Sequence, residues 1–312
     1  MSPRRIILDV DTGHDDAVAI MMAASVPELR LEAITVTAGN QTLGKTLANT
    51  LNVCDSLGID VPVYAGMKGP LLRDLVTAER IHGASGLDGP VFGQPMKAAE
   101  KEHAAVALAR MVMESPPDTL TLIAVGPLSN VAMAIRLQPE MASRLHELII
   151  MGGSIGRGNV TPSAEFNIHA DPESASIVFS SGAPVTMIGL DVTTRLVLDP
   201  ERLALLGSID GRAAEIFSQS MAHYLEACTH YLGEYPAMHD PSCVAYAACP
   251  DLMTLNRYYV AIECAGTLTA GRTVVDISGV TGKKPNAGVA TEVNGSLFWP
   301  MLERALRHWA SP

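Results

Sequence analysis

The segment formed by residues 6–20 constrains the fold of this chain more than any other. An apolar run at 6–10 is followed by a turn at Thr12-Gly13, after which residues 17–20 continue with an apolar helical pattern. A strand that turns directly into a helix is typical of α/β proteins, whose sites lie at the carboxyl ends of strands and at helix N-termini. One histidine and four aspartates surround this turn: Asp9, Asp11, His14, Asp15 and Asp16. The segment therefore predicts a polar site at one edge of a sheet.

Four carboxylates this close together repel one another unless a cation or a proton compensates their charge. Carboxylate oxygens are hard ligands, which favour Ca²⁺ or Mg²⁺ over Zn²⁺. A simpler interpretation is that Asp15 or Asp16 caps the helix and that Asp9 ends the strand in solvent. Capping accounts for one acidic residue but not for four, so we favour a cation site.

The composition fits a buried sheet and argues against several classes of partner. The 312 residues are 48% hydrophobic but only 4% aromatic, as expected for a parallel sheet covered on both faces. The net charge of −11 argues against nucleic acid or an anionic membrane as the main partner. The cysteines are odd in number and form no Cys-x-x-Cys pair, which indicates reduced thiols. Because a signal-peptide core and an apolar run of about 18 residues are both lacking, we expect a cytoplasmic protein without a membrane span.

Strand and helix patterns alternate through the first two thirds of the chain. Apolar runs at 31–37, 120–125 and 147–151 each end in a polar or glycine-rich turn. This alternation predicts an α/β fold with a mostly parallel, Rossmann-like central sheet flanked by helices. After a long helix expected at 212–231, strands at 258–263, 273–276 and 289–293 predict a small extra β/α subregion near the C-terminus. No linker-like tract separates it, so we treat residues 1–312 as a single domain.

Two histidine motifs far from the N-terminus are further candidates for the site. His239-Asp240 precede Pro241 at an expected helix start, where Asp240 could equally be an ordinary N-cap. His82 lies in a glycine-rich segment that could act as a flap over a site, or it could be an exposed loop residue.

A third candidate lies in the loop expected after the strand at 147–151. Asn159 is followed by Glu165-Phe166-Asn167, and these side chains could line a sugar site through their amide and carboxylate groups. A loop held together by its own hydrogen bonds is the alternative.

Several motifs together resemble one family. Residues Asp9-Val10-Asp11-Thr12-Gly13-His14-Asp15-Asp16-Ala17 resemble the D-x-D-x-G-x-D-D-A signature of the inosine–uridine-preferring nucleoside hydrolases. Further similar motifs follow in order: Ala38-Gly39-Asn40, His82-Gly83, Gly126-Pro127-Leu128-Ser129-Asn130, Met151-Gly152-Gly153, Glu165-Phe166-Asn167 and His239-Asp240. The resemblance covers the whole chain and includes the bacterial pyrimidine-specific ribonucleoside hydrolases. It implies a nucleoside hydrolase fold and hydrolysis of ribonucleosides to free base and D-ribose.

The resemblance implies one Ca²⁺ per subunit. Asp11, Asp16 and Asp240 would supply carboxylate oxygens, and Val125 would supply its backbone carbonyl. Ribose O2′ and O3′ and a water would complete a shell of about seven or eight oxygens, which suits Ca²⁺ better than Mg²⁺. Asp11 would also take the proton of the water that attacks C1′ while the bond to the base breaks.

The resemblance also implies the ribose contacts. Asp15 and Asn40 would hold O2′, Asn167 and Asp240 would hold O3′, and Glu165, Asn159 and the backbone of Met151 would hold the 5′-hydroxyl. Glu165 would in addition stabilise the cationic ribosyl group. Most of these groups recognise the sugar and not the base.

The leaving base must gain a proton or hydrogen bonds, and His239 and His82 are the implied donors. Ile81 and Phe166 would provide apolar contacts, whereas His14 is expected to have a supporting role. The helix before His239 would offer His223, Ala227, His230 and Tyr231 to the base. Tyr231 fits the aromatic hydroxyl of pyrimidine-selective relatives, but Ala227 and His223 depart from the side chains expected there. Uridine and cytidine are therefore the favoured substrates, while purine or broad specificity stays open.

Two other classes of function remain open at this point. Asp9-x-Asp11-Thr12 also resembles the opening of haloacid-dehalogenase phosphatases, which would use Asp9 as a nucleophile with Mg²⁺, although Gly13 and His14 depart from that pattern. The chain could also be a nucleoside-binding protein without activity. The family resemblance further suggests a homo-oligomer, either a tetramer or a dimer.

Overall fold

The computed structural model describes residues 2–310. Its strands are β1 (Arg4–Val10), β2 (Leu29–Val36), β3 (Val63–Ala65), β4 (Leu120–Ala124), β5 (Glu147–Met151), β6 (Val185–Ile188), β7 (Met253–Ile262), β8 (Thr273–Asp276) and β9 (Ala287–Val293). Its α-helices are α1 (His14–Ser25), α2 (Leu43–Leu57), α3 (Glu79–His82), α4 (Ala104–Glu114), α5 (Ser129–Leu137), α6 (Met141–Arg144), α7 (Phe166–Ala170), α8 (Pro172–Phe179), α9 (Leu190–Thr193), α10 (Pro200–Gly207), α11 (Arg212–Leu232), α12 (His239–Ala248) and α13 (Gly295–His308), with a 3₁₀ turn, η1, at Pro250–Leu252.

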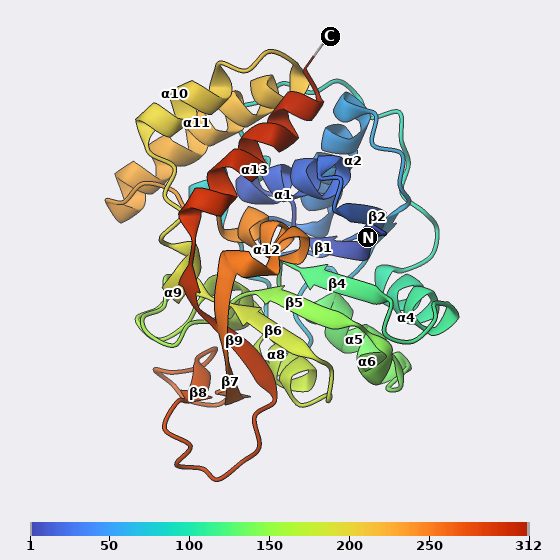
Figure 1. Ribbon diagram of the computed structural model, residues 1–312, viewed down its shortest axis with the longest axis vertical. Coiled ribbons are helices and arrows are strands. Elements are labelled where there is room, and N and C mark those ends of the chain that lie inside the picture. Colours follow the sequence, from blue (N-terminus) through green and yellow to red (C-terminus); the bar gives the residue numbers. More distant parts are fainter. Residues whose placement is uncertain (1, 311–312) are drawn as a thin grey trace.

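The strands form one sheet in the order β3-β2-β1-β4-β5-β6-β9-β7-β8 (Figure 1). All pairings from β3 to β9 in this order are parallel. The chain runs outward from β1 to β3 on one side and returns to place β4 on the other side of β1. Such a reversal opens a crevice beside the carboxyl ends of the two strands at the switch point, here β1 and β4. The mostly parallel α/β sheet predicted from the alternating pattern is confirmed.

Helices cover both faces of the sheet because successive residues of its strands point to opposite sides. In β1, Ile6 and Leu8 join one hydrophobic core, while Ile7 joins the other. The first core contains side chains of α1, α2, α11, α12 and α13, and the second contains side chains of α4, α5, α6 and α8. Figure 1 shows α1, α11 and α13 on one side of the strands and α5, α6 and α8 on the other.

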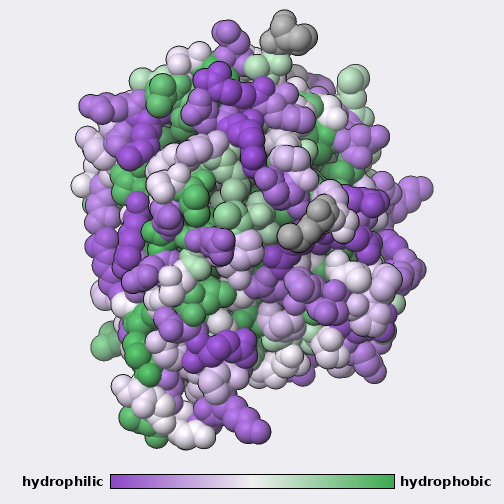
Figure 2. Space-filling model, in the orientation of Figure 1, coloured by the Kyte–Doolittle hydropathy of each residue, from purple (hydrophilic) through white to green (hydrophobic). Residues whose placement is uncertain are grey.

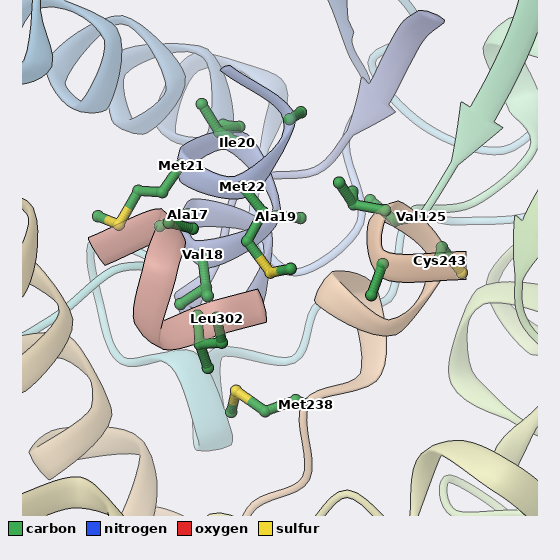
Figure 3. Packing of buried hydrophobic residues seen from close by; sticks show 14 of the residues in the cluster. Ala17, Val18, Ala19, Ile20, Met21, Met22, Val125, Met238, Cys243 and Leu302 are labelled. Atoms are coloured by element: carbon green, nitrogen blue, oxygen red, sulfur yellow. The ribbon is translucent and has the colours of Figure 1, made fainter. Parts of the chain in front are cut away.

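The first helix is buried on all sides, so its position is fixed by packing. Every residue from His14 to Ala23 is buried. Figure 3 shows the apolar side chains of α1, such as Val18 and Met22, near Leu302 of α13 and Met238. A helix that is apolar all round needs this enclosure, and it holds the acidic N-terminus of α1 rigidly at the sheet edge.

The C-terminal strands differ from the expectation in one respect. The antiparallel pairings of β7 with β8 and β9 are present, but β9 also pairs in parallel with β6. The C-terminal β/α subregion therefore extends the central sheet and does not form a separate element. One edge of β6 pairs with β5, and its other edge forms backbone hydrogen bonds with β9.

The face of the molecule in Figure 2 is covered mostly by hydrophilic side chains, and apolar side chains lie between polar ones at the end that carries β8. Exposed apolar residues of that region are Leu268, Val274, Ile277 and Val280. No helix within residues 2–310 has the length and apolar character needed to cross a membrane.

Candidate active site

The polar turns that end the parallel strands meet at one edge of the sheet, as predicted. Asp11 directly follows β1, Asn40 follows β2, Val125 follows β4, and Met151 is the last residue of β5. Asp240 reaches the same place from the first turn of α12, where its backbone N–H donates to Asp15 Oδ2 at 3.4 Å. Residues more than 220 positions apart are thus brought together by the packing of α12 against α1.

Three buried carboxylates form the centre of the site. Asp15, Asp16 and Asp240 each offer an oxygen, and these oxygens all lie within 4.8 Å of one another. The metal ligands predicted from the sequence were Asp11, Asp16 and Asp240. The group of three whose oxygens lie within 4.8 Å of one another shares Asp16 and Asp240 with that prediction but contains Asp15 in place of Asp11. Asp11 is also buried, and the charge of Asp16 acts on it.

Burial raises the pKa of all four carboxyl groups, because the charged form loses its hydration. The pKa of Asp15 is raised to about 7, first by burial and then by the charge of Asp16. The pKa of Asp240 is raised well above its usual range by burial and by the charges of Asp15, Asp16 and Asp11. A group of buried acids that repel one another is a site that a divalent cation would stabilise.

Backbone and amide donors orient two of these carboxylates. Asp16 accepts hydrogen bonds from the backbone N–H groups of Gly13 (2.8 Å) and Asp11 (3.1 Å), so it caps α1 while remaining in the acidic group. The backbone N–H of Asn40 donates to Asp11 Oδ2 at 2.6 Å, and the Asn40 side-chain amide donates to Asp16 Oδ2 at 3.0 Å. The capping interpretation and the cation interpretation of Asp16 are therefore compatible.

Two glycines leave the room that the Asp11 carboxylate occupies. A Cβ at position 39 would lie 2.2 Å from Asp11 Oδ2, and one at position 126 would lie 2.6 Å from Asp11 Oδ1. Neither distance is compatible with a side chain, so Gly39 and Gly126 permit a close approach of carboxylate and backbone. The contact also places the Asp11 carboxylate beside the residue that follows Val125.

Asp9 supports this turn from within the sheet. It is fully buried, and its Oδ1 accepts hydrogen bonds from Thr35 Oγ1 (2.5 Å) and Asn130 Nδ2 (2.8 Å). Its Oδ2 has no hydrogen-bond partner among the described residues, and burial raises its pKa to about 7. A carboxylate enclosed in this way has no access to a substrate, so the geometry is incompatible with the phosphatase nucleophile considered above.

Asn167 links the ends of β4 and β5. Its Nδ2 donates to the carbonyl oxygens of Val125 (2.7 Å) and Met151 (3.1 Å). The two backbone groups predicted to face metal and substrate are thus held by one side chain that was itself predicted as a ribose contact.

Glu165 caps a short helix that the sequence did not predict. Glu165, Phe166 and Asn167 were expected in a loop, but Phe166 opens α7 and Glu165 is its N-cap. Glu165 Oε1 accepts from the backbone N–H of Asn167 (2.8 Å), and Oε2 accepts from those of Gly153 (2.9 Å) and Ile168 (3.1 Å). Burial nevertheless raises the pKa of Glu165. Asn159 is exposed, and its Oδ1 accepts from the Phe166 backbone N–H at 3.0 Å, which fits the alternative of a loop held by its own hydrogen bonds.

His82 is buried at the end of α3, so it is not an exposed loop residue. Its ring stacks on that of His14 with centroids 5.2 Å apart, and the two Nδ1 atoms are 3.0 Å apart. His14 also stacks on His223 (5.3 Å) and Tyr224 (5.3 Å), and its Nε2 lies 2.9 Å from the carbonyl oxygen of Asp88. Burial lowers the pKa of His14 to about 4 and that of His82 well below its usual range. His14 thus lies at the centre of a stack of rings, and its supporting role stays a prediction.

His239 is the first residue of α12 and directly precedes Asp240. Its Nδ1 is 2.8 Å from the hydroxyl oxygen of Thr193 on α9, and burial lowers its pKa to about 4. His239 is thus held at the start of α12, beside Asp240, whereas His82 lies in the ring stack with His14.

The remaining predicted base contacts lie at the junction of α3 and α11. Tyr231 is 45% exposed, and the guanidinium carbon of Arg80 lies 4.8 Å from its ring centroid. Ile81 is half-buried next to Arg80, while His230 is exposed and Ala227 is buried. Tyr231 and His230 are therefore the exposed members of this group.

Two residues that sequence reasoning missed take part in this arrangement. Tyr224 lies in the ring stack, and Thr193 contacts His239. Thr193 could have been found, because it lies two residues after Asp191, at the carboxyl end of a predicted strand. Tyr224 gave no signal, since an aromatic residue within a long amphipathic helix is most often part of the core.

Comparison with known proteins agrees with this geometry. The family model described as inosine-uridine preferring nucleoside hydrolase matches residues 6–300. The chain therefore belongs to the inosine–uridine-preferring nucleoside hydrolase family, and it is an enzyme that hydrolyses the N-glycosidic bond of ribonucleosides.

Individual relatives cover nearly the whole chain. The pyrimidine-specific ribonucleoside hydrolase RihB of Escherichia coli O17:K52:H18 is 46% identical over 308 residues, which is 98% of both chains. The structure of a purine-preferring ribonucleoside hydrolase from Gardnerella vaginalis superposes with a TM-score of 0.91 at 31% identity, covering 97% of this chain and 98% of that one. The plant nucleoside hydrolase PpNRh1 gives a TM-score of 0.91 at 30% identity, covering 98% and 99%. All of these relatives are nucleoside hydrolases, which argues against a phosphatase and against a nucleoside-binding protein without activity.

Proposed function

We propose that this enzyme is a Ca²⁺-dependent hydrolase of pyrimidine ribonucleosides that uses Asp11 as its general base. The observation that carries the proposal is the buried acidic group, in which Asp15, Asp16 and Asp240 place oxygens within 4.8 Å of one another beside Asp11. Buried acids with raised pKa values require a cation or protons to exist together. Since all the donors are hard oxygens, Ca²⁺ fits them better than a transition metal.

We assign Asp11, Asp16, Asp240 and the carbonyl of Val125 as the groups that would hold the cation. The contact of the Asp11 carboxylate with Gly126 supports this set, because it brings the carboxylate next to the Val125 carbonyl. When bound, Ca²⁺ would supply Lewis-acid chemistry that lowers the pKa of a water molecule. Asp11 would accept that proton, and the backbone N–H of Asn40 holds its Oδ2 in a fixed position for this task.

The strand ends would orient the ribose. Asp15 and Asn40 are assigned to O2′, Asn167 and Asp240 to O3′, and Glu165, Asn159 and the Met151 backbone to the 5′-hydroxyl. The support is position, since most of these groups are buried at the same sheet edge. Both oxygens of Glu165 already accept backbone hydrogen bonds, which favours an electrostatic role for this carboxylate toward a cationic ribosyl group.

His239 and His82 are assigned to the leaving base, with Ile81 and Phe166 as apolar neighbours and His223 and Tyr231 as base contacts. The proposed pyrimidine preference rests on the 46% identity with the E. coli enzyme, whose name states that specificity. The ring of His223, stacked on His14, is a specific feature that instead favours a purine, since it offers a broad aromatic surface.

We also propose a homo-oligomeric, cytoplasmic enzyme. Exposed apolar residues near β8, such as Leu268 and Val280, support an interface, and five free cysteines support a reducing compartment. Light scattering of the wild type and of Leu268→Asp would test the interface, because a monomeric wild type contradicts it.

The decisive experiment measures released ribose from uridine, cytidine, inosine and adenosine, with and without EDTA. We expect turnover of uridine and cytidine that chelation abolishes and added Ca²⁺ restores. Asp11→Ala should lose activity on every substrate, whereas Asp210→Asn, an exposed aspartate outside the site, should retain it. Full activity in EDTA would contradict the metal assignment, and preferred release of ribose from inosine would replace the pyrimidine assignment.

A further inference from the structure

Thr193 makes a hydrogen bond whose direction can be deduced. It is fully buried on α9, and its Oγ1 lies 2.8 Å from His239 Nδ1. Within residues 2–310 this ring nitrogen is the one hydrogen-bond partner of the Thr193 hydroxyl. A buried hydroxyl proton needs an acceptor, so the Thr193 O–H donates and His239 Nδ1 accepts.

This direction determines the tautomer of His239. A neutral imidazole that accepts at Nδ1 carries its proton on Nε2. A doubly protonated ring would have to donate through Nδ1 and would leave the Thr193 proton without an acceptor. The contact therefore favours the neutral ring with an Nε2–H, and among the described residues no hydrogen bond occupies that Nε2.

The position of the threonine is itself well fixed. The backbone N–H of Leu190 donates to Gly153 O at 2.9 Å, and the Asp191 carboxylate accepts from the backbone N–H groups of Ile155 (2.6 Å) and Gly156 (3.0 Å). These bonds tie α9 to the loop that follows β5. The hydroxyl of Thr193 is thus presented by a rigid element to the first residue of α12.

We propose that Thr193 is a positioning residue, which holds His239 as the Nε2–H tautomer so that this N–H donates a hydrogen bond to the departing base. This inference rests on the proposed role of His239 in the hydrolase reaction. In the reaction, the C1′–N bond breaks with its electron pair going to the base, and an O–C1′ bond forms from water. The proton of the attacking water goes to Asp11. The Nε2–H stabilises the negative charge that develops on the base without itself leaving the ring, and the departed base anion takes its proton from solvent.

The test compares two substrates that differ in their need for such a donor. Uracil is a poor leaving group, whereas the nitrophenolate of 4-nitrophenyl β-D-riboside leaves without assistance. Thr193→Val keeps the shape but removes the hydroxyl, so we expect kcat for uridine to fall about tenfold or more while KM and nitrophenyl riboside turnover stay near wild type. Thr193→Ser should restore uridine turnover. Thr194→Val is the matched control, because among residues 2–310 the Thr194 hydroxyl bonds only to Leu190 O, within its own helix turn.

A spectroscopic measurement separates positioning from a general structural effect. In protein labelled with ¹⁵N-histidine, the His239 resonances, assigned through His239→Asn, should report a protonated Nε2 in the wild type and a mixture of tautomers in Thr193→Val. Equal losses on both substrates, or an unchanged tautomer in Thr193→Val, would overturn the inference. A wild-type enzyme that cleaves neither substrate would instead contradict the proposed function, so the two failures are distinguishable.

Discussion

Calcium should stabilise this protein strongly at pH 7.5 and much less at pH 5. The reason is that the acidic group at the sheet edge binds either protons or a cation. The pKa of Asp15 is raised from 3.8 to about 7. Between these two values the folded protein keeps the Asp15 proton, whereas the unfolded chain has released it. The free energy of unfolding of the metal-free protein therefore falls as the pH rises from about 4 to about 7. At about 1.4 kcal/mol per pKa unit, the loss from Asp15 alone is about 4 kcal/mol.

The size of the calcium effect follows from the same pKa. Asp15 lies within 4.8 Å of the proposed ligands Asp16 and Asp240, so a bound cation favours its charged form. Below pH 7, cation binding therefore releases at least the Asp15 proton, and the affinity falls about tenfold per pH unit and about 100-fold between pH 7 and pH 5. At a fixed Ca²⁺ concentration above the dissociation constant, this corresponds to about 2.7 kcal/mol less stabilisation. For a chain of this size, about 2 °C per kcal/mol gives a difference of about 5 °C in the calcium-induced shift of Tm.

The assay is thermal unfolding in EDTA and in excess Ca²⁺ at each pH, with the shift between the two conditions as the readout. Taking this difference removes the contribution of the buried histidines, whose lowered pKa values destabilise the fold at acid pH with or without metal. Asp240→Asn should reduce the shift at pH 7.5, whereas Asp210→Asn should not. An equal calcium shift at pH 5 and pH 7.5, or an undiminished shift in Asp240→Asn, would refute the reasoning.

Two further predictions concern the groups that hold the site in place. Gly39→Ala would place a Cβ 2.2 Å from Asp11 Oδ2, so we expect the unfolding free energy to fall by about 1–3 kcal/mol and kcat to fall about 100-fold. Gly44→Ala is the control, because a Cβ at position 44 meets no atom within 4 Å and should leave both quantities nearly unchanged. Asn167→Ala would remove the 2.7 Å hydrogen bond to Val125 O, so chemical denaturation should show a loss of about 1–3 kcal/mol in unfolding free energy. In the ribose-release assay KM should rise, and an unchanged KM would exclude the proposed ribose contact.

The first part of the site could be predicted from the sequence because it is local. A strand, a turn and a helix fix Asp11 and Asp16 within a few residues, and the parallel connection of strands brings Asn40 and Val125 to the same edge. Asp240 could be predicted as part of the acidic group only from the family resemblance, since no local pattern encodes the packing of α12 against α1. For the same reason the sequence could not decide whether Asp11 or Asp15 lies nearest to Asp240.

The parts that were not predicted depend on tertiary contacts of residues with weak local signals. Glu165 was expected in a loop because residues 152–165 contain glycine and polar residues, but its carboxylate caps the five-residue helix α7 through the backbone N–H groups of Asn167 and Ile168. Thr193 lies on a four-residue helix, which is too short to show a helical period. The extension of the sheet by β9 also required the position of β6, which only the folded chain defines.

The arrangement of the site separates recognition of the sugar from recognition of the base. The groups assigned to cation and ribose, such as Asp11 and Asn167, are fixed by strand ends and by buried backbone hydrogen bonds. Several groups assigned to the base, such as Ile81 and His223, come instead from α3 and α11, where Tyr231 is 45% exposed and contacts Arg80. We therefore expect an exchange of His223 to leave the acidic group in place, because its ring stacks on His14 and makes no hydrogen bond to these aspartates among the described residues. Base preference can change within this fold while the chemistry at the ribose is preserved, which is consistent with pyrimidine-specific and purine-preferring enzymes among its relatives.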